Sequence, residues 1–362
     1  MLRMIRVLIV EDSPAVREFL VHVLGSDAEI QVVGTAKDGK EALEAVERLR
    51  PDVITMDIHM PILNGFEATR RIMEENPTPI VIVSGSWDRQ EVAKTFHAIE
   101  AGALAAIPRP LGIGHPRHVD STADLIRTVK LMSEVKVVRR WARRAVARVS
   151  PPELDSGGVP SHQTAAEIKI VAIGASTGGP VVLQTILSSL PRDLPVPILI
   201  VQHMAAGFTE GFVEWLAHSS NLPICLAAHG EAPLPGRAYV APDGFQMKVD
   251  GRGAITLTND EPENGLRPSV SCLFRSVADV YGRKAVGILL TGMGKDGAEE
   301  LKTMKDSGAA TIAQDKESSV VHGMPGAAIQ LGAAAYVLSP ERIAAALVDL
   351  VGRPRKDLWA TK

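Results

Sequence analysis

Three side chains that could together perform nucleophilic catalysis lie far apart in the sequence, and the first is a serine. Ser176 stands between Gly174 and Gly178 in the stretch VAIGASTGGP, so the spacing G-x-S-x-G follows an apolar run and precedes a helical one. This is the context in which a sharp strand-to-helix turn exposes a serine hydroxyl. A glycine-rich turn of this kind can equally cradle a phosphate with its backbone N–H groups, so the motif alone leaves both interpretations open.

A base and an acid follow at the ends of two later apolar runs. His203 comes directly after ILIVQ, and Asp296 follows GILLTGMGK. A serine nucleophile needs a base and a group that orients the base, whatever their order along the chain. If the three runs are parallel strands of one sheet, their ends share one edge and Ser176, His203 and Asp296 converge there. A single histidine or aspartate after a strand is usually a turn residue, but the coincidence of all three favours catalysis.

A second group of polar residues follows other strand-like runs near the N-terminus. Glu11 and Asp12 come directly after IRVLIV, and Asp57 ends DVITMD. Three carboxylates at one sheet edge repel one another, and a hard cation such as Mg²⁺ relieves that repulsion. Asp57 could then act as a carboxylate nucleophile toward phosphate. Ser84, at the end of PIVIVS, could donate a hydrogen bond to the acquired phosphoryl oxygens.

The elements that must position these residues alternate between short β-branched runs and helical patterns in both halves of the chain. This alternation predicts two α/β domains, each a doubly wound parallel sheet. Within the second, the stretch 236–260 has the alternation and turn residues of an antiparallel hairpin. We place the first domain at 1–120, a connecting helix and flexible linker at 121–166, and the second domain at 167–355. The connecting helix spans about 122–149 and carries an arginine run, and the linker covers 150–164.

Composition narrows the class of protein. With 362 residues, 46% of them hydrophobic, the chain can bury more than one core, and its net charge of -3 gives no reason to expect nucleic acid as a partner. The two cysteines are too few for a disulfide framework, and no run reaches the length of a membrane span. We therefore expect a cytoplasmic protein without direct membrane insertion.

The stretches VLIVEDSPAVR, DVITMDIHMPILNGFE and PIVIVSG resemble the receiver domain of two-component response regulators over residues 3–111. The resemblance implies a flavodoxin-like fold in which Asp57 takes phosphate from a histidine kinase, and Glu11 and Asp12, with Asp57, hold Mg²⁺. In that family a lysine follows the fifth strand and contacts the phosphoryl group. Here Arg109 stands in its place, and Ala106 replaces the usual aromatic switch residue.

The stretches IGASTGGP, VQHM, RPSVSCLF, LLTGMGKDG and AQDKESSVVHGMPGAA resemble the catalytic domain of the chemotaxis protein-glutamate methylesterase family, over 168 to about 350. The resemblance implies a Rossmann-like hydrolase that cleaves glutamate γ-methyl esters on chemoreceptors and, in many members, deamidates glutamines. It implies Ser176 as nucleophile, His203 as general base and Asp296 as the residue that orients His203. It also implies the backbone N–H of Met293, with Thr177, as the oxyanion site. No cofactor is expected for ester hydrolysis.

Two other functions compete with a phosphorylation-regulated esterase. One is a response regulator whose hydrolase-like domain serves as a protein-interaction module or acts on a non-receptor target. The other is a phosphate- or nucleotide-binding domain that uses GASTGG, although the chain lacks the lysine of a P-loop and the full dinucleotide glycine pattern. An interaction module has no need of Ser176, His203 and Asp296 together, so the three residues favour the esterase.

Overall fold

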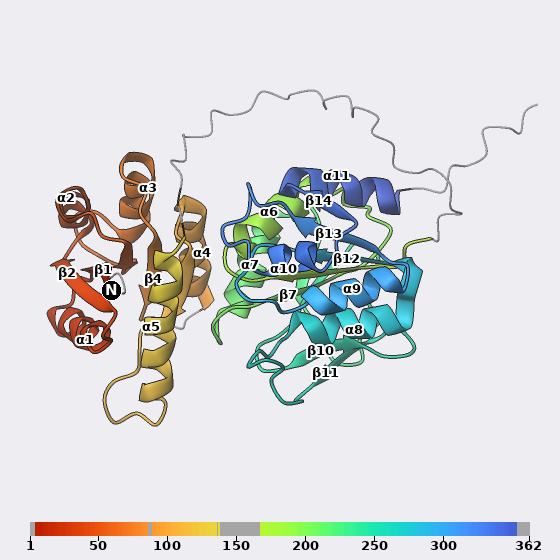
Figure 1. Cartoon of the computed structure of the whole chain (residues 1–362), viewed down its shortest axis with the longest axis horizontal. Coiled ribbons are helices and arrows are strands. Elements are labelled where there is room, and N and C mark those ends of the chain that lie inside the picture. The colour runs from red at the N-terminus through yellow and green to blue at the C-terminus, as the bar shows by residue number, and fades with distance from the viewer. Residues whose placement is uncertain (1–3, 86–88, 136, 138–166, 353–362) are drawn as a thin grey trace, which may run out of the picture.

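The structure is a computed structural model that describes residues 4–85, 89–135, 137 and 167–352, with residues 89–94 described by their backbone alone. The whole of the predicted arginine run and the whole predicted linker lie outside these residues. The described chain forms two α/β domains that lie side by side (Figure 1).

The N-terminal domain is built on a five-stranded sheet in the order β2-β1-β3-β4-β5. All its neighbouring strands are parallel. This order is the flavodoxin-like arrangement, so the fold expected for this half is confirmed. The sheet consists of β1 (Ile5–Val10), β2 (Ile30–Ala36), β3 (Val53–Met56), β4 (Ile80–Ser84) and β5 (Ala105–Pro108).

Helices cover both faces of this sheet because the strands are apolar on both sides. Residues 53–56 and 80–84 are buried throughout, as expected of central parallel strands. One core lies under α2 (Gly39–Leu49), α3 (Gly65–Glu75) and α4 (Arg89–Ala101). The other lies under α1 (Pro14–Gly25) and α5 (His118–Ser133). Helix α5 packs on the sheet through Leu125 and Val129. Residue 120, where we placed the end of the first domain, therefore lies within a helix of that domain.

The C-terminal domain is built on a seven-stranded parallel sheet in the order β14-β13-β12-β6-β7-β9-β8. The chain builds outward from β6 to β7 on one side, then returns to β12 on the other side of β6. In open parallel sheets, ligands bind beyond the carboxyl ends of the strands where the order reverses in this way. The strands are β6 (Ile170–Ala175), β7 (Ile198–Gln202), β8 (Ile224–Leu226), β9 (Ala238–Val240), β12 (Ala285–Leu289), β13 (Ala310–Gln314) and β14 (Tyr336–Leu338).

The predicted hairpin is present but shorter than expected. It consists of β10 (Gln246–Val249) and β11 (Ile255–Thr258), paired antiparallel. The start of the same stretch, β9, instead joins the main sheet in parallel between β7 and β8. All three residues of β9 are buried, and a short buried run carries no alternation that would distinguish the two kinds of pairing.

Helices cover both faces of the second sheet as well. One core lies under α6 (Gly179–Ser189), α7 (Thr209–Ser219) and α11 (Pro340–Val351). The opposite core lies under α8 (Val270–Tyr281), α9 (Ala298–Asp306) and α10 (Met324–Gln330), with a short 3-10 turn, η1 (Gly282–Lys284), between α8 and β12.

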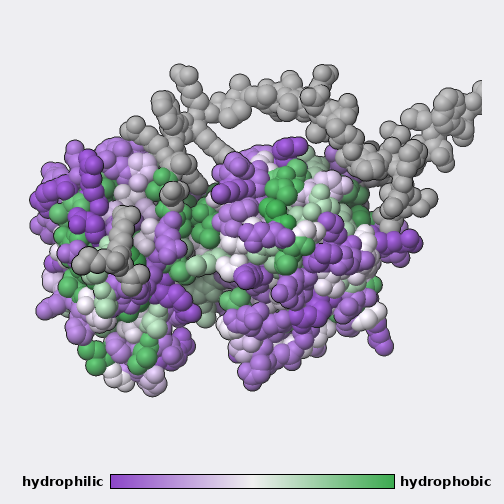
Figure 2. Space-filling model, in the orientation of Figure 1, coloured by the Kyte–Doolittle hydropathy of each residue, from purple (hydrophilic) through white to green (hydrophobic). Residues whose placement is uncertain are grey.

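The two domains meet through α4 and α7. Phe96 of α4 packs against Phe212 and Trp215, with ring centroids 5.3 Å and 5.4 Å apart. Glu100 accepts a hydrogen bond from Gln184 of α6. Phe96 and Ile99 are buried in the core that belongs to the second domain. Figure 2 shows the two lobes in contact, with hydrophobic side chains at the boundary between them.

None of the helices in the described part of the chain is long and apolar enough to cross a membrane.

Candidate active site

Ser176 lies on the turn between β6 and α6, at the edge where the strand order reverses. Its backbone N–H donates to the carbonyl of Thr291 at 3.0 Å, which ties this turn to the segment after β12. The helix begins at Gly179, and Gly178 before it takes the left-handed conformation, with φ of 79°. An L-residue with a side chain would be strained there, so the glycine allows the sharp turn. The predicted strand-to-helix turn is present.

His203 and Asp296 are joined by a hydrogen bond at the same edge. The distance from His203 Nε2 to Asp296 Oδ2 is 2.9 Å. The carboxylate is also the acceptor for the N–H of Val270 at 2.6 Å, the N–H of Ser271 at 3.1 Å and the hydroxyl of Ser269 at 2.8 Å. These donors fix the carboxylate at the N-terminus of α8. Because Nε2 is used by Asp296, the other ring nitrogen of His203, Nδ1, is left for the serine side.

The electrostatics of this site keep Asp296 ionised. Burial alone would raise the pKa of its carboxyl group, but the hydrogen bond and charge of His203 and the hydrogen bonds from Ser271 and Ser269 outweigh burial and lower the pKa to about 2. An ionised carboxylate stabilises an imidazolium beside it and fixes which ring nitrogen carries the proton. The pair can therefore support a base that accepts a proton through Nδ1.

The segment after β12 lies against the turn that carries Ser176. A Cβ added to Gly292 would come within 2.6 Å of Ser176 Cβ, so only glycine allows the two turns to approach this closely. The next residue, Met293, donates its backbone N–H to no other described residue, and neither does Thr177. Two N–H groups without partners beside a serine could hold an oxyanion.

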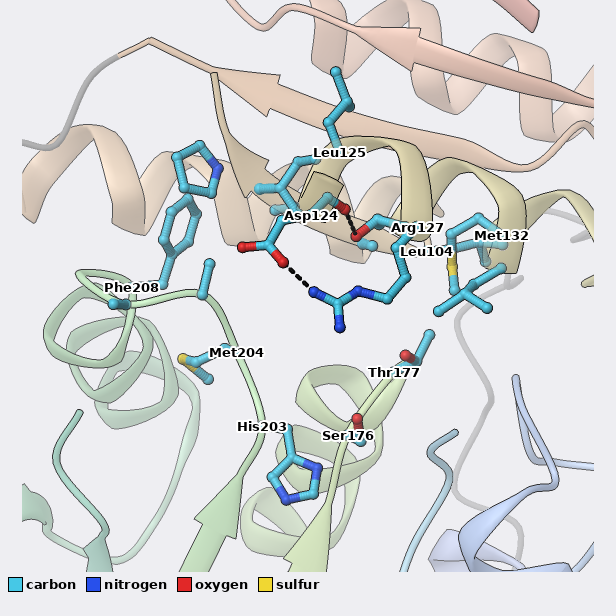
Figure 3. Close-up of a pocket in the computed structure, with 18 of the residues that line it drawn as sticks. Leu104, Asp124, Leu125, Arg127, Met132, Ser176, Thr177, His203, Met204 and Phe208 are labelled. Atoms are coloured by element: carbon cyan, nitrogen blue, oxygen red, sulfur yellow. Dashed lines mark hydrogen bonds and ion pairs between the residues drawn. The ribbon is translucent and has the colours of Figure 1, made fainter. Parts of the chain in front are cut away.

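These residues open into a cleft of about 490 Å³ that both domains line. Ser176, Thr177 and His203 form its floor. Asp124 and Arg127 of α5, which pair with each other, lie across it (Figure 3). The helix of one domain therefore forms a wall over Ser176 of the other. Ser176 Oγ makes no hydrogen bond to His203 here, and such bonds often tighten only when substrate is bound.

The second predicted cluster is also assembled. Oxygen atoms of Glu11, Asp12 and Asp57 lie within 4.8 Å of one another. Burial, and then the charge of Asp57, raises the pKa of Glu11 to about 7, and burial raises the pKa of Asp57. Crowded carboxylates with raised pKa values are the chemistry that a hard cation relieves. The residues present fit Mg²⁺.

Arg109 and Ser84 lie beside this cluster. Ser84 is the last residue of β4, and its carbonyl accepts from the backbone N–H of Arg109 at 2.7 Å. The guanidinium Nη2 of Arg109 lies 3.1 Å from Glu11 Oε2, so the arginine pairs with one of the three carboxylates. A Cβ added to Gly85 would lie 2.9 Å from this guanidinium. The missing side chain at Gly85 makes room for the bulkier cation.

Sequence reasoning missed three residues of the active-site edge. Ser269 and Ser271 bind the carboxylate of Asp296, and Ser269 also caps α8 by accepting from the N–H of Ser271. A serine directly before an apolar helical run is a capping signal that could have been used. Gln202, the third, precedes His203 and is buried. No pattern in the sequence indicates what its amide contacts.

Comparison with known proteins adds independent information. The family model described as CheB methylesterase matches residues 171–347, and that described as response regulator receiver domain matches residues 7–115. A protein from Nitrosospira multiformis named protein-glutamate methylesterase/protein-glutamine glutaminase is 64% identical over 96% of this chain and 97% of its own. One of the same name from Geobacter metallireducens is 59% identical over 96% and 99%. The crystal structure of the Thermotoga maritima CheB methylesterase catalytic domain is 39% identical, covers 51% of this chain and all of that domain, and has a TM-score of 0.50.

Proposed function

The chain belongs to the protein-glutamate methylesterase/protein-glutamine glutaminase family, and we propose that Ser176, His203 and Asp296 carry out its ester hydrolysis. The observation that carries this assignment is the 2.9 Å bond between His203 and Asp296, at the strand end next to Ser176. The two later residues come from opposite sides of β6 and meet at one edge. That convergence is what a nucleophile, a base and an orienting acid require.

The reaction would proceed in two steps through a covalent intermediate. Ser176 Oγ attacks the carbonyl carbon of a glutamate γ-methyl ester while His203 Nδ1 accepts the hydroxyl proton. The tetrahedral intermediate collapses, the ester C–O bond breaks, and the same proton passes from His203 to the departing methoxide, which leaves as methanol. Water, activated by His203, then cleaves the acyl-serine and leaves a glutamate carboxylate. With a glutamine substrate the leaving group would be ammonia.

The oxyanion would be held by the backbone N–H groups of Met293 and Thr177. Both lack partners among the described residues, and Gly292 brings the Met293 segment against Ser176. Donors fixed in this way stabilise charge that exists only in the transition state, and losing one costs about 3 kcal/mol in well-studied hydrolases.

The N-terminal domain would receive a phosphoryl group on Asp57. Glu11, Asp12 and Asp57 would hold Mg²⁺, which would screen the carboxylates from the incoming phosphate. Ser84 and Arg109 would contact the phosphoryl oxygens. A histidine kinase is the proposed phosphodonor and a methylated chemoreceptor the proposed substrate, both in the cytoplasm. Because α5 forms a wall of the cleft, phosphorylation would raise activity by favouring an arrangement in which that wall has moved away.

The assignment is tested by methanol release from membranes that contain methylated chemoreceptor. Ser176→Ala keeps the turn but removes the group that forms the acyl intermediate, so release should fall to near the uncatalysed level. Ser188→Ala, an exposed serine on the following helix, serves as the matched control and should behave like the unsubstituted protein. Methanol release by Ser176→Ala at the unsubstituted rate would refute the assignment.

A further inference from the structure

The buried side chain of Gln202 connects the two turns that carry Ser176 and His203. Gln202 is the last residue of β7, opposite Ala175 of β6, and only 5% of it is exposed. Its Nε2 donates to the carbonyl of Ser176 at 2.9 Å and to the carbonyl of His203 at 2.8 Å. One amide group therefore binds the backbone of both residues.

These two bonds act where the regular pairing of the strands stops. The N–H of His203 still donates to the carbonyl of Ala175 at 2.9 Å, the last backbone bond between β6 and β7 among the described residues. Beyond that point, no hydrogen bonds between the two described backbone segments hold them at a fixed distance from each other. The amide of Gln202 supplies the connection one residue farther, at the level of the reacting side chains.

The surroundings of Gln202 leave its amide one orientation. Nε2 faces two carbonyl oxygens, so an oxygen atom in its place would be repelled by both. Oε1 is buried without a hydrogen-bond partner among the described residues. It lies against the start of α6, where a Cβ added to Gly179 would come within 2.1 Å of it. The second glycine of the STGG turn thus provides the space that this side chain fills.

We propose that Gln202 is a positioning residue for the esterase, which holds the Ser176 turn and the His203 turn at the separation that proton transfer requires. The inference rests on the proposed roles of Ser176 and His203. Reacting groups must be held within about 0.5 Å of their productive geometry. A mutation that does not touch the reacting atoms but displaces them by about 1 Å can lower the rate about a hundredfold. Gln202 does not touch the reacting atoms, and its effect passes through the backbone of the two residues that do.

The first test replaces Gln202 by Met, which has similar length and can lie against Gly179 but donates no hydrogen bond. We expect kcat for methanol release from a peptide carrying a glutamate γ-methyl ester to fall at least tenfold, while KM changes less than twofold. The rate of Ser176 labelling by a fluorophosphonate should fall in parallel, because labelling uses the same serine and base. Gln202→Glu, which places a carboxylate against two carbonyls, should show the same or a larger loss.

The control is Thr311→Val, which removes a buried hydrogen bond to the carbonyl of Ala333 from β13, a strand of the same sheet that is not a neighbour of β6. It should lower the melting temperature without changing kcat or the labelling rate. All rates are measured per folded molecule, well below the melting temperature, and Gln202→Ala is used if the Met variant does not fold.

The measurements distinguish failure of the positioning role of Gln202 from failure of the proposed function. If Ser176→Ala is inactive but Gln202→Met keeps kcat and the labelling rate within twofold of the unsubstituted protein, the positioning role is wrong and the catalytic assignment stands. If Thr311→Val loses as much activity as Gln202→Met at a similar fall in melting temperature, the positioning role is also overturned. If the unsubstituted protein is not labelled and Ser176→Ala still releases methanol, the proposed function itself fails.

Discussion

The carboxylate of Asp296 is surrounded by hydrogen-bond donors, which leaves no place for an amide. Asp296→Asn would turn an NH₂ group either toward the ring of His203 and the N–H of Val270 or toward the N–H of Ser271. We expect kcat to fall about 10³- to 10⁴-fold, because the imidazole loses both its orientation and its stabilising charge. Methanol release measures the effect, with Asp349→Asn, an exposed position on α11, as the control. A loss of less than tenfold would contradict the orienting role.

The same carboxylate makes the stability of the C-terminal domain depend on pH. Its pKa is about 2 in the folded protein and 3.8 ordinarily, so the unfolded chain binds the proton first as pH falls. The contribution to stability is therefore complete above about pH 4 and is lost as pH falls to about 2, and it is on the order of 2 kcal/mol. Denaturant unfolding between pH 6 and 2 should show the difference between the unsubstituted protein and Asp296→Asn shrinking as pH falls. A constant difference would contradict this account.

Arg109 competes with a metal ion for Glu11. Its guanidinium lies 3.1 Å and 3.4 Å from the two carboxylate oxygens, whereas a lysine offers a single point charge. Arg109→Lys should bind Mg²⁺ several times more tightly, as measured by calorimetric titration of the unphosphorylated protein. Arg71→Lys, on the exposed surface of α3, is the control. Equal affinities in Arg109→Lys and the unsubstituted protein would show that the ion pair does not oppose the metal.

At the residue scale, the sequence predicted the polar residues at strand ends because parallel strands bring their ends to one edge. It could not predict the contacts of Gln202, or those of Ser269 and Ser271 with Asp296, because these contacts depend on the local geometry of turns. The backbone partner of Ser176 is the carbonyl of Thr291, and no spacing rule connects these two positions. The catalytic and phosphoryl-binding roles of the predicted residues remain proposals.

At the scale of single elements, the residue that caps α8 also binds Asp296. Ser269 caps this helix and donates to Asp296. Ser269→Ala removes both bonds, so we expect the free energy of unfolding to fall by about 1–2 kcal/mol and kcat to fall as well. Ser339→Ala, at the start of α11, is the comparison, because that serine makes no capping bond with its side chain. A drop in stability without any drop in kcat would mean that the donor to Asp296 is dispensable.

Buried β-branched runs predicted the central strands of both sheets, since strands buried on both faces read as continuous apolar segments. The three-residue strands were harder to predict. β8 was missed, and β9 was assigned to the hairpin, because a run of three residues is too short to show a period. Their place at the end of the sheet is decided by packing against β7 and α7, which involves residues distant in sequence.

For the whole molecule, the contact of Phe96 with Phe212 and Trp215 holds α5 over the cleft. A tenfold rise in basal activity needs a shift of about 1.4 kcal/mol toward the open arrangement, which is less than the roughly 3–5 kcal/mol that removing a buried phenylalanine costs. Phe96→Ala should therefore raise methanol release without a phosphodonor, whereas Val348→Ala on the exposed side of α11 should not. Unchanged basal release in Phe96→Ala would contradict inhibition by coverage.

Phosphorylation should shift the same equilibrium between the arrangement in which α5 covers the cleft and the open arrangement. With Mg²⁺ and a small-molecule phosphodonor, the unsubstituted protein should become more active, and Asp57→Asn should keep its basal rate because it cannot accept the phosphoryl group. The donor should add little to Phe96→Ala, in which the cover is already displaced. Equal activation of Asp57→Asn and the unsubstituted protein would place the acceptor elsewhere.

The backbone bond from Ser176 to Thr291 makes the Ser176 turn depend on a segment that is synthesised much later. Domains generally fold as units during synthesis, N-terminal first. All five strands of the N-terminal sheet precede residue 109, whereas the Ser176 turn needs β12, more than a hundred residues after it. A nascent chain that has released β6 and β7 holds the serine and the histidine but neither Asp296 nor the support of Thr291. On the proposed roles, the N-terminal domain is therefore synthesised in full before Thr291 and Asp296 complete the site that it covers.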